Sequence, residues 1–205
     1  YKVGDILQGQ MGWQTYKVSS ITSSEKFRKV PDTGISYSIG LSLFGMTGFS
    51  AYFGFFNSGA PRQEDTVVIS GAAGGVGSIV VQLAKNLGCQ VIGIAGGHEK
   101  CRFIKDLGCD IALDYKSGDI AEKIKDATPD GIDLYFDNVG GLILDAALSK
   151  LRMHARVVIC GAISQYNKKH KIDGPSNYLS LLVTRSSMQG MVVMDYTKDF
   201  GKAAR

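Results

Sequence analysis

Cysteine, proline and tryptophan are scarce in this 205-residue chain, which contains four, four and one of them. The four cysteines are scattered and form no CxxC pair: Cys89, Cys101, Cys109 and Cys160. Because a tetrahedral zinc site draws on closely spaced Cys and His ligands, we expect no metal site within this segment. Free thiols fit a reducing compartment, so we expect a cytoplasmic protein.

Long apolar runs and a strong charge of one sign are also missing. No stretch has the apolar length of a membrane span or the pattern of a signal peptide, so we expect no membrane association. The formal net charge is +4, and the only dense basic run is Lys168, Lys169, His170 and Lys171. A run that short is typical of a solvated loop, so we expect no nucleic-acid partner.

From residue 66 onward, strand-like and helix-like segments alternate. β-Branched or apolar runs predict strands at 66–70, 90–95, 111–115, 132–137, 155–160 and 187–193. Helical spacing predicts helices at 78–87, 99–107, 120–125, 142–151 and 178–183. This alternation predicts an α/β fold with a doubly wound parallel sheet of the Rossmann type, which binds ligands where the strand order reverses.

The first part of the chain has a different pattern. Short β-type runs at Ile6–Leu7 and Gln14–Val18 predict the tail of a separate β-rich domain over residues 1–34, followed by the sheet domain over 35–205. Apolar residues at 36–56 have helical spacing but are interrupted by glycines, which predicts two helices or a broken one. Because the chain starts without Met and ends in what reads as the start of a helix, we expect a fragment whose C-terminal part is missing.

Glycine is abundant, and one cluster lies between the first strand and the first helix of the alternation. The segment Ser70–Gly77 reads SGAAGGVG, with Ala72 in place of the first glycine of the usual dinucleotide fingerprint. We expect Gly74 to let the backbone approach a pyrophosphate and Gly77 to let the helix pack closely on the strand. The helix N-terminus would then face the phosphates, which predicts a dinucleotide site.

The end of the second strand indicates which dinucleotide. An NAD site has a carboxylate there to accept a hydrogen bond from the ribose 2′-hydroxyl, whereas residues 94–98 read IAGGH. Glu99 follows His98, and then comes Lys100, which can meet a 2′-phosphate. Tyr115, at the end of the third strand, can add a hydroxyl donor. These residues favour NADP(H), although each could equally be an ordinary surface or packing residue.

Five segments together resemble a known family. They are GMTGFSAYFG at 45–54, AAGGVG at 72–77, HEK at 98–100, YFDNVGG at 135–141 and CGAISQYN at 160–167. They are similar to the zinc-independent medium-chain dehydrogenases/reductases, in particular the group of prostaglandin reductases, leukotriene 12-hydroxydehydrogenases and alkenal reductases. The likeness runs over essentially the whole chain and implies that residues 1–34 are the remnant of a GroES-like domain.

The resemblance also implies roles for individual residues. The pyrophosphate loop would comprise Ala73, Gly74, Gly75 and Val76, and the 2′-phosphate would lie at Lys100 and Tyr115. Asn138 would lie near the cofactor, and the loop on the nicotinamide side would comprise Cys160, Gly161, Ala162, Ile163, Ser164 and Tyr166. The strand that meets the carboxamide would contribute Met191, Val192 and Val193.

The implied reaction is the NADPH-dependent reduction of a C=C bond conjugated to a ketone or aldehyde. Tyr166 would then be the catalytic residue, because a hydroxyl aimed at the substrate carbonyl stabilises the enolate charge. The small-molecule substrate would be an enone or alkenal, and the resemblance implies a homodimer formed through Met188–Val193.

Two other functions remain open. The first is another enzyme of the same fold, a quinone reductase or a zinc alcohol dehydrogenase, whose metal ligands would lie mostly upstream of Tyr1. The second is a module that binds NADPH without turnover, since a fold alone does not determine activity.

Overall fold

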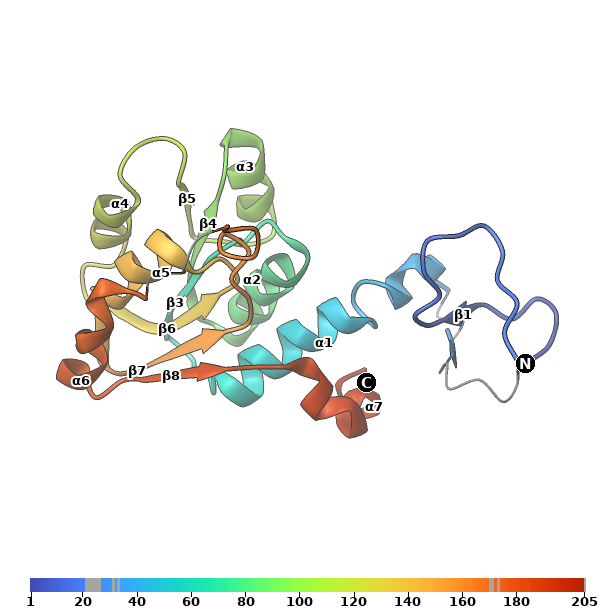
Figure 1. The fold of residues 1–205 in the computed structure, drawn as a ribbon. Helices are drawn as coiled ribbons and strands as arrows, with labels where there is room; N and C mark the ends of the chain where they lie inside the picture. Colours follow the sequence, from blue (N-terminus) through green and yellow to red (C-terminus); the bar gives the residue numbers. More distant parts are fainter. Residues whose placement is uncertain (21–26, 31, 33, 170–171, 173, 205) are drawn as a thin grey trace.

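The computed structural model describes residues 1–20, 27–30, 32, 34–169, 172 and 174–204, and within them an α/β part and an N-terminal segment that stands apart from it (Figure 1). In the N-terminal segment, β1 (Leu7–Gln8) pairs antiparallel with β2 (Arg28–Lys29). Arg28 ties this segment to the rest, because its guanidinium donates to the Phe44 carbonyl and lies 5.6 Å from the centre of the Phe49 ring.

The α/β part is built on a sheet of six described strands. They are β3 (Thr66–Ile69), β4 (Gln90–Ala95), β5 (Ile111–Asp114), β6 (Ile132–Asp137), β7 (Leu151–Ile159) and β8 (Ser187–Gly190). Their order is β5-β4-β3-β6-β7-β8, and every neighbouring pair is parallel. The predicted doubly wound parallel sheet is thereby confirmed, and the strand order reverses between β3 and β6.

Helices cover both faces of this sheet (Figure 1). They are α1 (Met46–Phe53), which continues into a π-helical turn (Gly54–Ser58), α2 (Gly75–Leu87), α3 (His98–Asp106), α4 (Ile120–Ala127), α5 (Gly141–Leu148), α6 (Ser180–Thr184) and α7 (Phe200–Ala203). In the described part of the chain, 3₁₀ helices span Tyr37–Gly40, Ser176–Leu179 and Val193–Asp199. Of the described helices, none is long and apolar enough to cross a membrane.

Two hydrophobic clusters, one on each face, explain why the strand sequences are continuously apolar. In β3, Val67 and Ile69 pack with α1, α2 and α3, whereas Val68 packs with α4 and α5 on the other face. All three side chains are fully buried. Since successive strand residues point to opposite faces, a sheet covered on both sides needs an apolar residue at every position.

Two sequence expectations were wrong in their details. Residues 14–18 form no strand, and Tyr16 and Val18 are exposed. The helix expected at 142–151 ends at Leu148, because a turn at Lys150 places Leu151 beside Ile132 as the first residue of β7.

The domain boundary at residue 34 stays a prediction, and His170 and Lys171 of the basic run lie outside the described residues.

The last predicted strand is also shorter than expected. It ends at Gly190 instead of residue 193, because the chain then turns onto α1. There the ring of Tyr196 stacks on Phe53 at 4.6 Å and the ring of Phe200 stacks on Phe49 at 4.2 Å. Aromatic packing of this kind outweighs the strand preference of three apolar residues.

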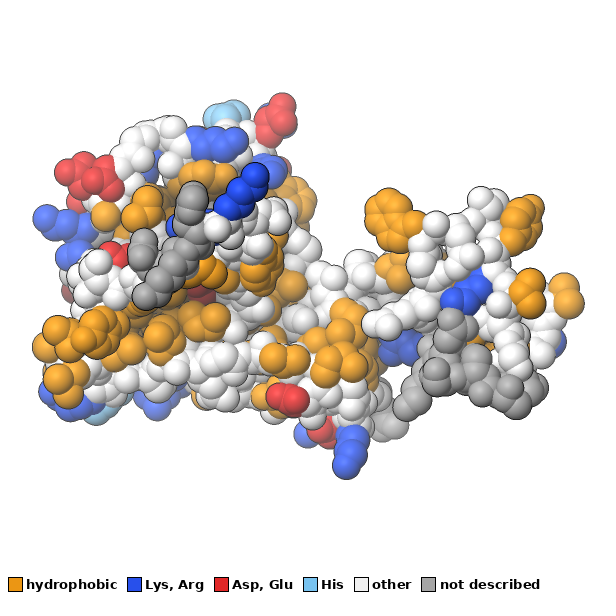
Figure 2. All heavy atoms as spheres, viewed as in Figure 1, with side chains coloured by type: hydrophobic (Ala, Val, Ile, Leu, Met, Phe, Trp, Pro, Cys, Tyr) orange, Lys and Arg blue, Asp and Glu red, His pale blue; other side chains and the backbone are white. Residues whose placement is uncertain are grey.

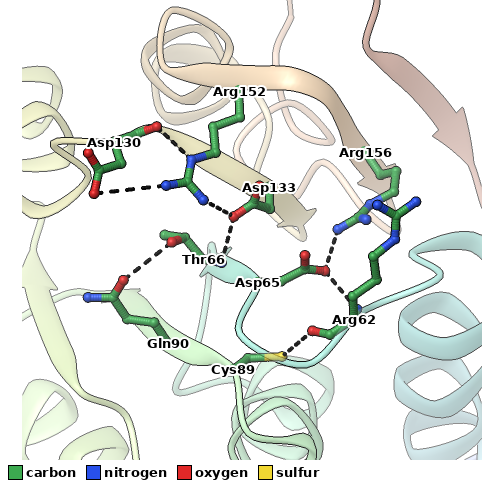
Figure 3. Close-up of polar contacts among 9 residues, drawn as sticks. All are labelled: Arg62, Asp65, Thr66, Cys89, Gln90, Asp130, Asp133, Arg152 and Arg156. Atoms are coloured by element: carbon green, nitrogen blue, oxygen red, sulfur yellow. Dashed lines mark hydrogen bonds and ion pairs between the residues drawn. The ribbon is translucent and has the colours of Figure 1, made fainter.

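The amino-terminal ends of the central strands carry a network of polar residues (Figure 3). Arg156 donates to Asp65 at 2.5 Å, and both side chains are largely buried. Asp133 accepts from the Arg152 guanidinium at 2.7 Å and from the Thr66 N–H at 2.9 Å. This network joins β3, β6 and β7 at the edge of the sheet opposite to their carboxyl ends.

Candidate functional site

A cleft of about 1110 Å³ opens at the carboxyl ends of the strands. It is bordered by the glycine loop after β3, the end of β4, the turn after β6 and the loop after β7. This is the place where the strand order reverses, which is where a doubly wound sheet binds its ligand.

The glycine loop folds tightly at the foot of α2. A β-carbon on Gly77 would lie 2.3 Å from the Gly71 carbonyl oxygen and 2.8 Å from the Ala72 Cα, so no side chain fits there. Gly77 therefore lets α2 approach the backbone of the loop that follows β3, where close packing of the helix on the strand was expected. A β-carbon on Gly75 would lie 2.9 Å from Thr47 Cγ2, so α1 also packs against this loop.

The N-terminus of α2 is electrostatically suited to an anion. Gly74 is the N-cap and offers no side chain to the first N–H groups of the helix, and the first turn contains no acidic residue. The unpaired N–H groups and the positive end of the helix dipole therefore face the cleft. Ala73, Gly74, Gly75 and Val76, the four residues predicted for the pyrophosphate loop, all line it.

The turn after β6 is organised by a buried carboxyl group. Asp137 is fully buried, and its Oδ1 accepts from Ser70 Oγ at 2.6 Å, Tyr135 Oη at 3.0 Å and the Val139 N–H at 3.0 Å. Its Oδ2 accepts from the Gly140 N–H at 3.0 Å. Burial, followed by the charge of Asp137, raises the pKa of the Tyr135 hydroxyl well above its usual value, so this phenol remains a donor.

At the far end of the cleft lie the two residues predicted for a 2′-phosphate. Lys100 comes from α3 and Tyr115 follows β5, and both line the cleft. The Tyr115 ring lies against Gly96 at the end of β4, where a β-carbon would be 2.7 Å from the ring. The two predicted donors thus share one end of the cleft, although in the sequence the rest of α3 and the strand β5 lie between them.

The carboxylate that precedes Tyr115 in the sequence is held by the backbone. Asp114 Oδ1 accepts from the N–H groups of Gly97 and Lys116, each at 2.9 Å. The Gly97 bond, followed by the Lys116 bond, lowers the pKa of Asp114. Asp114 therefore shapes the turn after β4, and residues 94–98 themselves contain no carboxylate.

The loop after β7 forms the opposite wall. Ala162, Ile163 and Ser164 line the cleft, as does Asn138 from the turn after β6. Cys160 and Gly161 lie beneath this wall and donate through their N–H groups to the Asp137 carbonyl at 2.9 and 3.1 Å. Burial raises the pKa of the Cys160 thiol to about 11, so it is protonated at neutral pH and unsuited to act as a nucleophile.

Tyr166, the predicted catalytic residue, is not among the residues that line the cleft. Its side chain is 63% exposed, and its hydroxyl oxygen accepts a hydrogen bond from the Ala162 N–H at 2.9 Å. Within the described residues, no acceptor for the hydroxyl proton is present. The Tyr166 hydroxyl is thus held against the loop that forms the cleft wall while its proton stays free to be donated.

The segment predicted to meet the carboxamide lies apart from the cleft lining. The side chains of Met191 and Val193 are 7% and 8% exposed and belong to the core on the α1 side, and Met191 packs against Gly54. Val192 is exposed. A contact with a ligand at this segment would therefore come from its backbone or from Val192.

Sequence reasoning did not single out Ser70, Asp137 or Gln165. Gln165 is 8% exposed, lines the cleft, and its Nε2 donates to Ser164 Oγ at 2.6 Å. Ser70 and Asp137 are polar residues at the end of an apolar strand, whereas Gln165 is a buried polar residue in the loop after β7. A polar residue at the end of an apolar strand is the signal that could have identified Ser70 and Asp137, because buried polar groups need hydrogen-bond partners.

The described residues contain no group of three or more His, Cys, Asp or Glu side chains placed to hold a metal ion.

Comparison with known proteins gives a family and close relatives. The model of the family described as zinc-binding dehydrogenase matches residues 75–205. The NADP-dependent oxidoreductase YfmJ of Bacillus subtilis is 45% identical over 100% of this chain and 60% of its own length. The 2-alkenal reductase (NADP(+)-dependent) of Nicotiana tabacum is 40% identical over 96% of this chain and 57% of its own.

A solved structure agrees with the fold. The crystal structure of CurA from Vibrio vulnificus in complex with NADPH superposes with a TM-score of 0.82 at 42% identity. The match covers 89% of this chain and 56% of CurA. The chain thus spans somewhat more than half the length of the proteins it matches.

Proposed function

Because this chain belongs to the zinc-binding dehydrogenase family, we propose that it is the NADPH-binding part of a reductase that saturates a C=C bond conjugated to a ketone or aldehyde. The relatives named above carry residues beyond the match, so the activity is proposed for the full-length protein. The observation that carries the proposal is the cleft itself. It has a helix end suited to an anion in the middle, Lys100 and Tyr115 at one end, and the loop of Tyr166 at the other.

The residues present fit NADPH better than NADH. The α2 N-terminus without acidic residues suits a pyrophosphate, and the Lys100 ammonium suits a further phosphate on the adenosine ribose. The ribose carboxylate of an NAD site is absent from the end of β4, and Asp114 is engaged by two backbone N–H groups. The name of the tobacco relative and the NADPH bound to CurA support the same cofactor.

When bound, NADPH would supply a hydride to the β-carbon of the substrate. Negative charge then builds on the carbonyl oxygen, and the Tyr166 hydroxyl is suited to stabilise it. Because its oxygen already accepts from Ala162, the hydroxyl is fixed in place and its proton can be donated outward. A proton from solvent water would then add to the α-carbon, which completes the addition of two hydrogens across the double bond.

We also propose that the protein is a homodimer. β8 lies at the edge of the sheet, and all four of its residues are exposed. Figure 2 shows hydrophobic side chains gathered over α6 beside it. Leu182 and Val183 of α6 and Leu179 at the end of the preceding 3₁₀ helix are each more than half exposed. An unpaired edge next to an apolar patch is suited to pairing with a second copy. The cytoplasmic location stays a prediction.

The experiment follows the absorbance of reduced nicotinamide with the full-length protein. NADPH is mixed with a panel of α,β-unsaturated ketones and aldehydes, with quinones, and, in the reverse direction, NADP⁺ is mixed with simple alcohols. We expect consumption that depends on the enone and yields the saturated carbonyl compound. Turnover of quinones or alcohols alone would identify the other enzymes of this fold, and binding without any turnover would identify a binding module.

A further inference from the structure

The glycine loop after β3, the turn after β6 and the loop after β7 meet at the cleft. The turn after β6 is hydrogen-bonded to both of the others. The consecutive carbonyl oxygens of Asp137, Asn138 and Val139 accept hydrogen bonds from the loop after β7. Their donors are the N–H groups of Cys160 and Gly161, the N–H of Ile163, and both the N–H and the hydroxyl of Ser164, at 2.7 to 3.1 Å. The cleft wall that carries Tyr166 is therefore placed by the turn after β6.

The same turn is tied to the glycine loop through Ser70. Ser70 Oγ donates to Asp137 Oδ1 at 2.6 Å and accepts from the Asn138 N–H at 2.8 Å. The Asn138 side chain donates back to the Ser70 carbonyl at 2.7 Å. Ser70 is the last residue before Gly71, so these bonds fix the start of the glycine loop relative to the turn after β6. Ser70 and Asp137 are both fully buried.

The hydrogen bonds to Asp137 come from groups without charge. Its carboxyl group accepts from two hydroxyls and two backbone N–H groups, and among the described residues no Lys, Arg or His side chain contacts it. Burying a carboxyl group without a cation costs folding free energy. Stability alone is therefore a weak reason for Asp137 to be there. Its donors come from the residue after β3, from β6 and from the turn after β6, and this geometry is suited to hold the glycine loop and that turn at a fixed distance.

We infer that Ser70 and Asp137 are a positioning pair. They act through the glycine loop and the turn after β6, and through that turn on the loop of Tyr166, so that the cleft is preorganised for NADPH. Neither Ser70 nor Asp137 is among the residues that line the cleft. This inference rests on the proposed function, since it names what arranges the proposed cofactor site.

The test compares two single substitutions in the full-length protein. Ser70→Ala and Tyr135→Phe each remove one hydroxyl that donates to Asp137 Oδ1. Only Ser70 connects the glycine loop to the turn, whereas Tyr135 lies in the core on the α4 and α5 side. Dissociation constants for NADPH and NADP⁺ are measured by titration, and melting temperatures report the loss of stability of each variant.

We expect Ser70→Ala to raise the dissociation constants of NADPH and NADP⁺ about tenfold. Without the Ser70 hydroxyl, the glycine loop and the turn after β6 are held less firmly, and the groups that bind the cofactor are displaced. Tyr135→Phe should change both constants less than about twofold at a comparable loss of stability. Equal weakening in the two variants would overturn the inference and leave the pair with a structural role only. If the unaltered protein does not bind NADPH, the proposed function fails instead.

A second variant covers the case in which Ser70→Ala does not fold. Asp137→Asn keeps the size of the side chain and an oxygen acceptor, but it places an amide group opposite the N–H donors of the turn. We expect it to weaken NADPH at least as much as Ser70→Ala does. An unchanged dissociation constant in folded Asp137→Asn would also overturn the inference.

Discussion

The carbonyl oxygen of Gly71 lies 2.3 Å from the position that a β-carbon on Gly77 would occupy. Since the blocking atom belongs to the backbone, it cannot rotate away as a side chain could. Gly77→Ala therefore has to shift either the glycine loop or α2. We expect it to lower the free energy of unfolding by about 3 kcal/mol and to abolish NADPH binding.

Gly201→Ala is the matched control for this substitution. Nothing lies within 4 Å of a β-carbon at Gly201, which is inside helix α7. Alanine there should leave stability and NADPH binding unchanged or raise stability slightly. Chemical unfolding and cofactor titration check both variants, and a Gly77→Ala protein with normal stability would contradict the packing described here.

Lys100 provides the prediction on cofactor choice. Lys100→Ala should weaken NADPH about tenfold to a hundredfold, because charge-assisted bonds to the 2′-phosphate are lost. NADH lacks that phosphate and should be affected little. Lys105→Ala is the control, because it removes the same charge from α3 at a residue outside the cleft, where Lys105 Nζ donates to the Asp110 carbonyl at 2.5 Å. Equal weakening of NADPH and NADH by Lys100→Ala would show that Lys100 has a structural role.

Much of the fold could be predicted because its signals are local. The bounds of β4 and β6 agree with the apolar runs at 90–95 and 132–137, and Gly88 ends α2 in a left-handed conformation, as expected of a helix C-terminal glycine. Lys100 and Tyr115 could be placed at one edge because both follow the carboxyl ends of neighbouring strands.

The parts that sequence reasoning missed depend on contacts between distant segments. Ser70 and Asp137 are 67 residues apart, and no local pattern shows that their side chains meet. The path of Met191–Val193 is determined by the packing of Tyr196 and Phe200 on α1. Strand propensity depends on the local residues alone and does not include such contacts. The direction of the Tyr166 hydroxyl depends on the backbone of a loop that is itself placed by the turn after β6.

The polar network at the amino-terminal ends of β3, β6 and β7 should contribute to stability (Figure 3). Arg156 and Asp65 form a pair whose side chains are 15% and 10% exposed. Asp65→Ala leaves the guanidinium buried without its partner and should cost about 3 to 5 kcal/mol. Lys85→Ala breaks the more exposed pair with Asp110 and should cost less than about 1 kcal/mol. Urea unfolding compares the two, and similar losses would contradict the difference in burial.

The four thiols should react with iodoacetamide in an order set by their pKa values. Burial raises the pKa of Cys89, Cys109 and Cys160 to about 11, and it raises that of the less buried Cys101 as well. A raised thiol pKa favours the protonated form, so little reactive thiolate is present at pH 8. Mass spectrometry should find Cys101 labelled first.

The pH dependence of this labelling gives a further check. The rate at Cys160 should still rise about tenfold per pH unit between pH 8 and 10, because its thiolate fraction grows until the pH reaches the pKa. Protein unfolded in urea is the control and should be labelled at all four cysteines. A plateau near pH 9 at Cys160 in the folded protein would contradict the raised pKa.

Tyr166→Phe tests the chemistry proposed for the cleft wall. The substitution removes the hydroxyl and keeps the ring, so the loop loses one hydrogen bond from the Ala162 N–H. In the proposed reaction the substrate carbonyl would lose its donor as well. We expect kcat for an enone to fall about a hundredfold, as for the loss of one oxyanion donor. The dissociation constant for NADPH should stay within about twofold, since Tyr166 is not part of the cleft lining. Tyr178→Phe, at an exposed tyrosine outside the cleft, is the control. If Tyr166→Phe raised KM and left kcat unchanged, the residue would shape the substrate pocket without stabilising the developing charge.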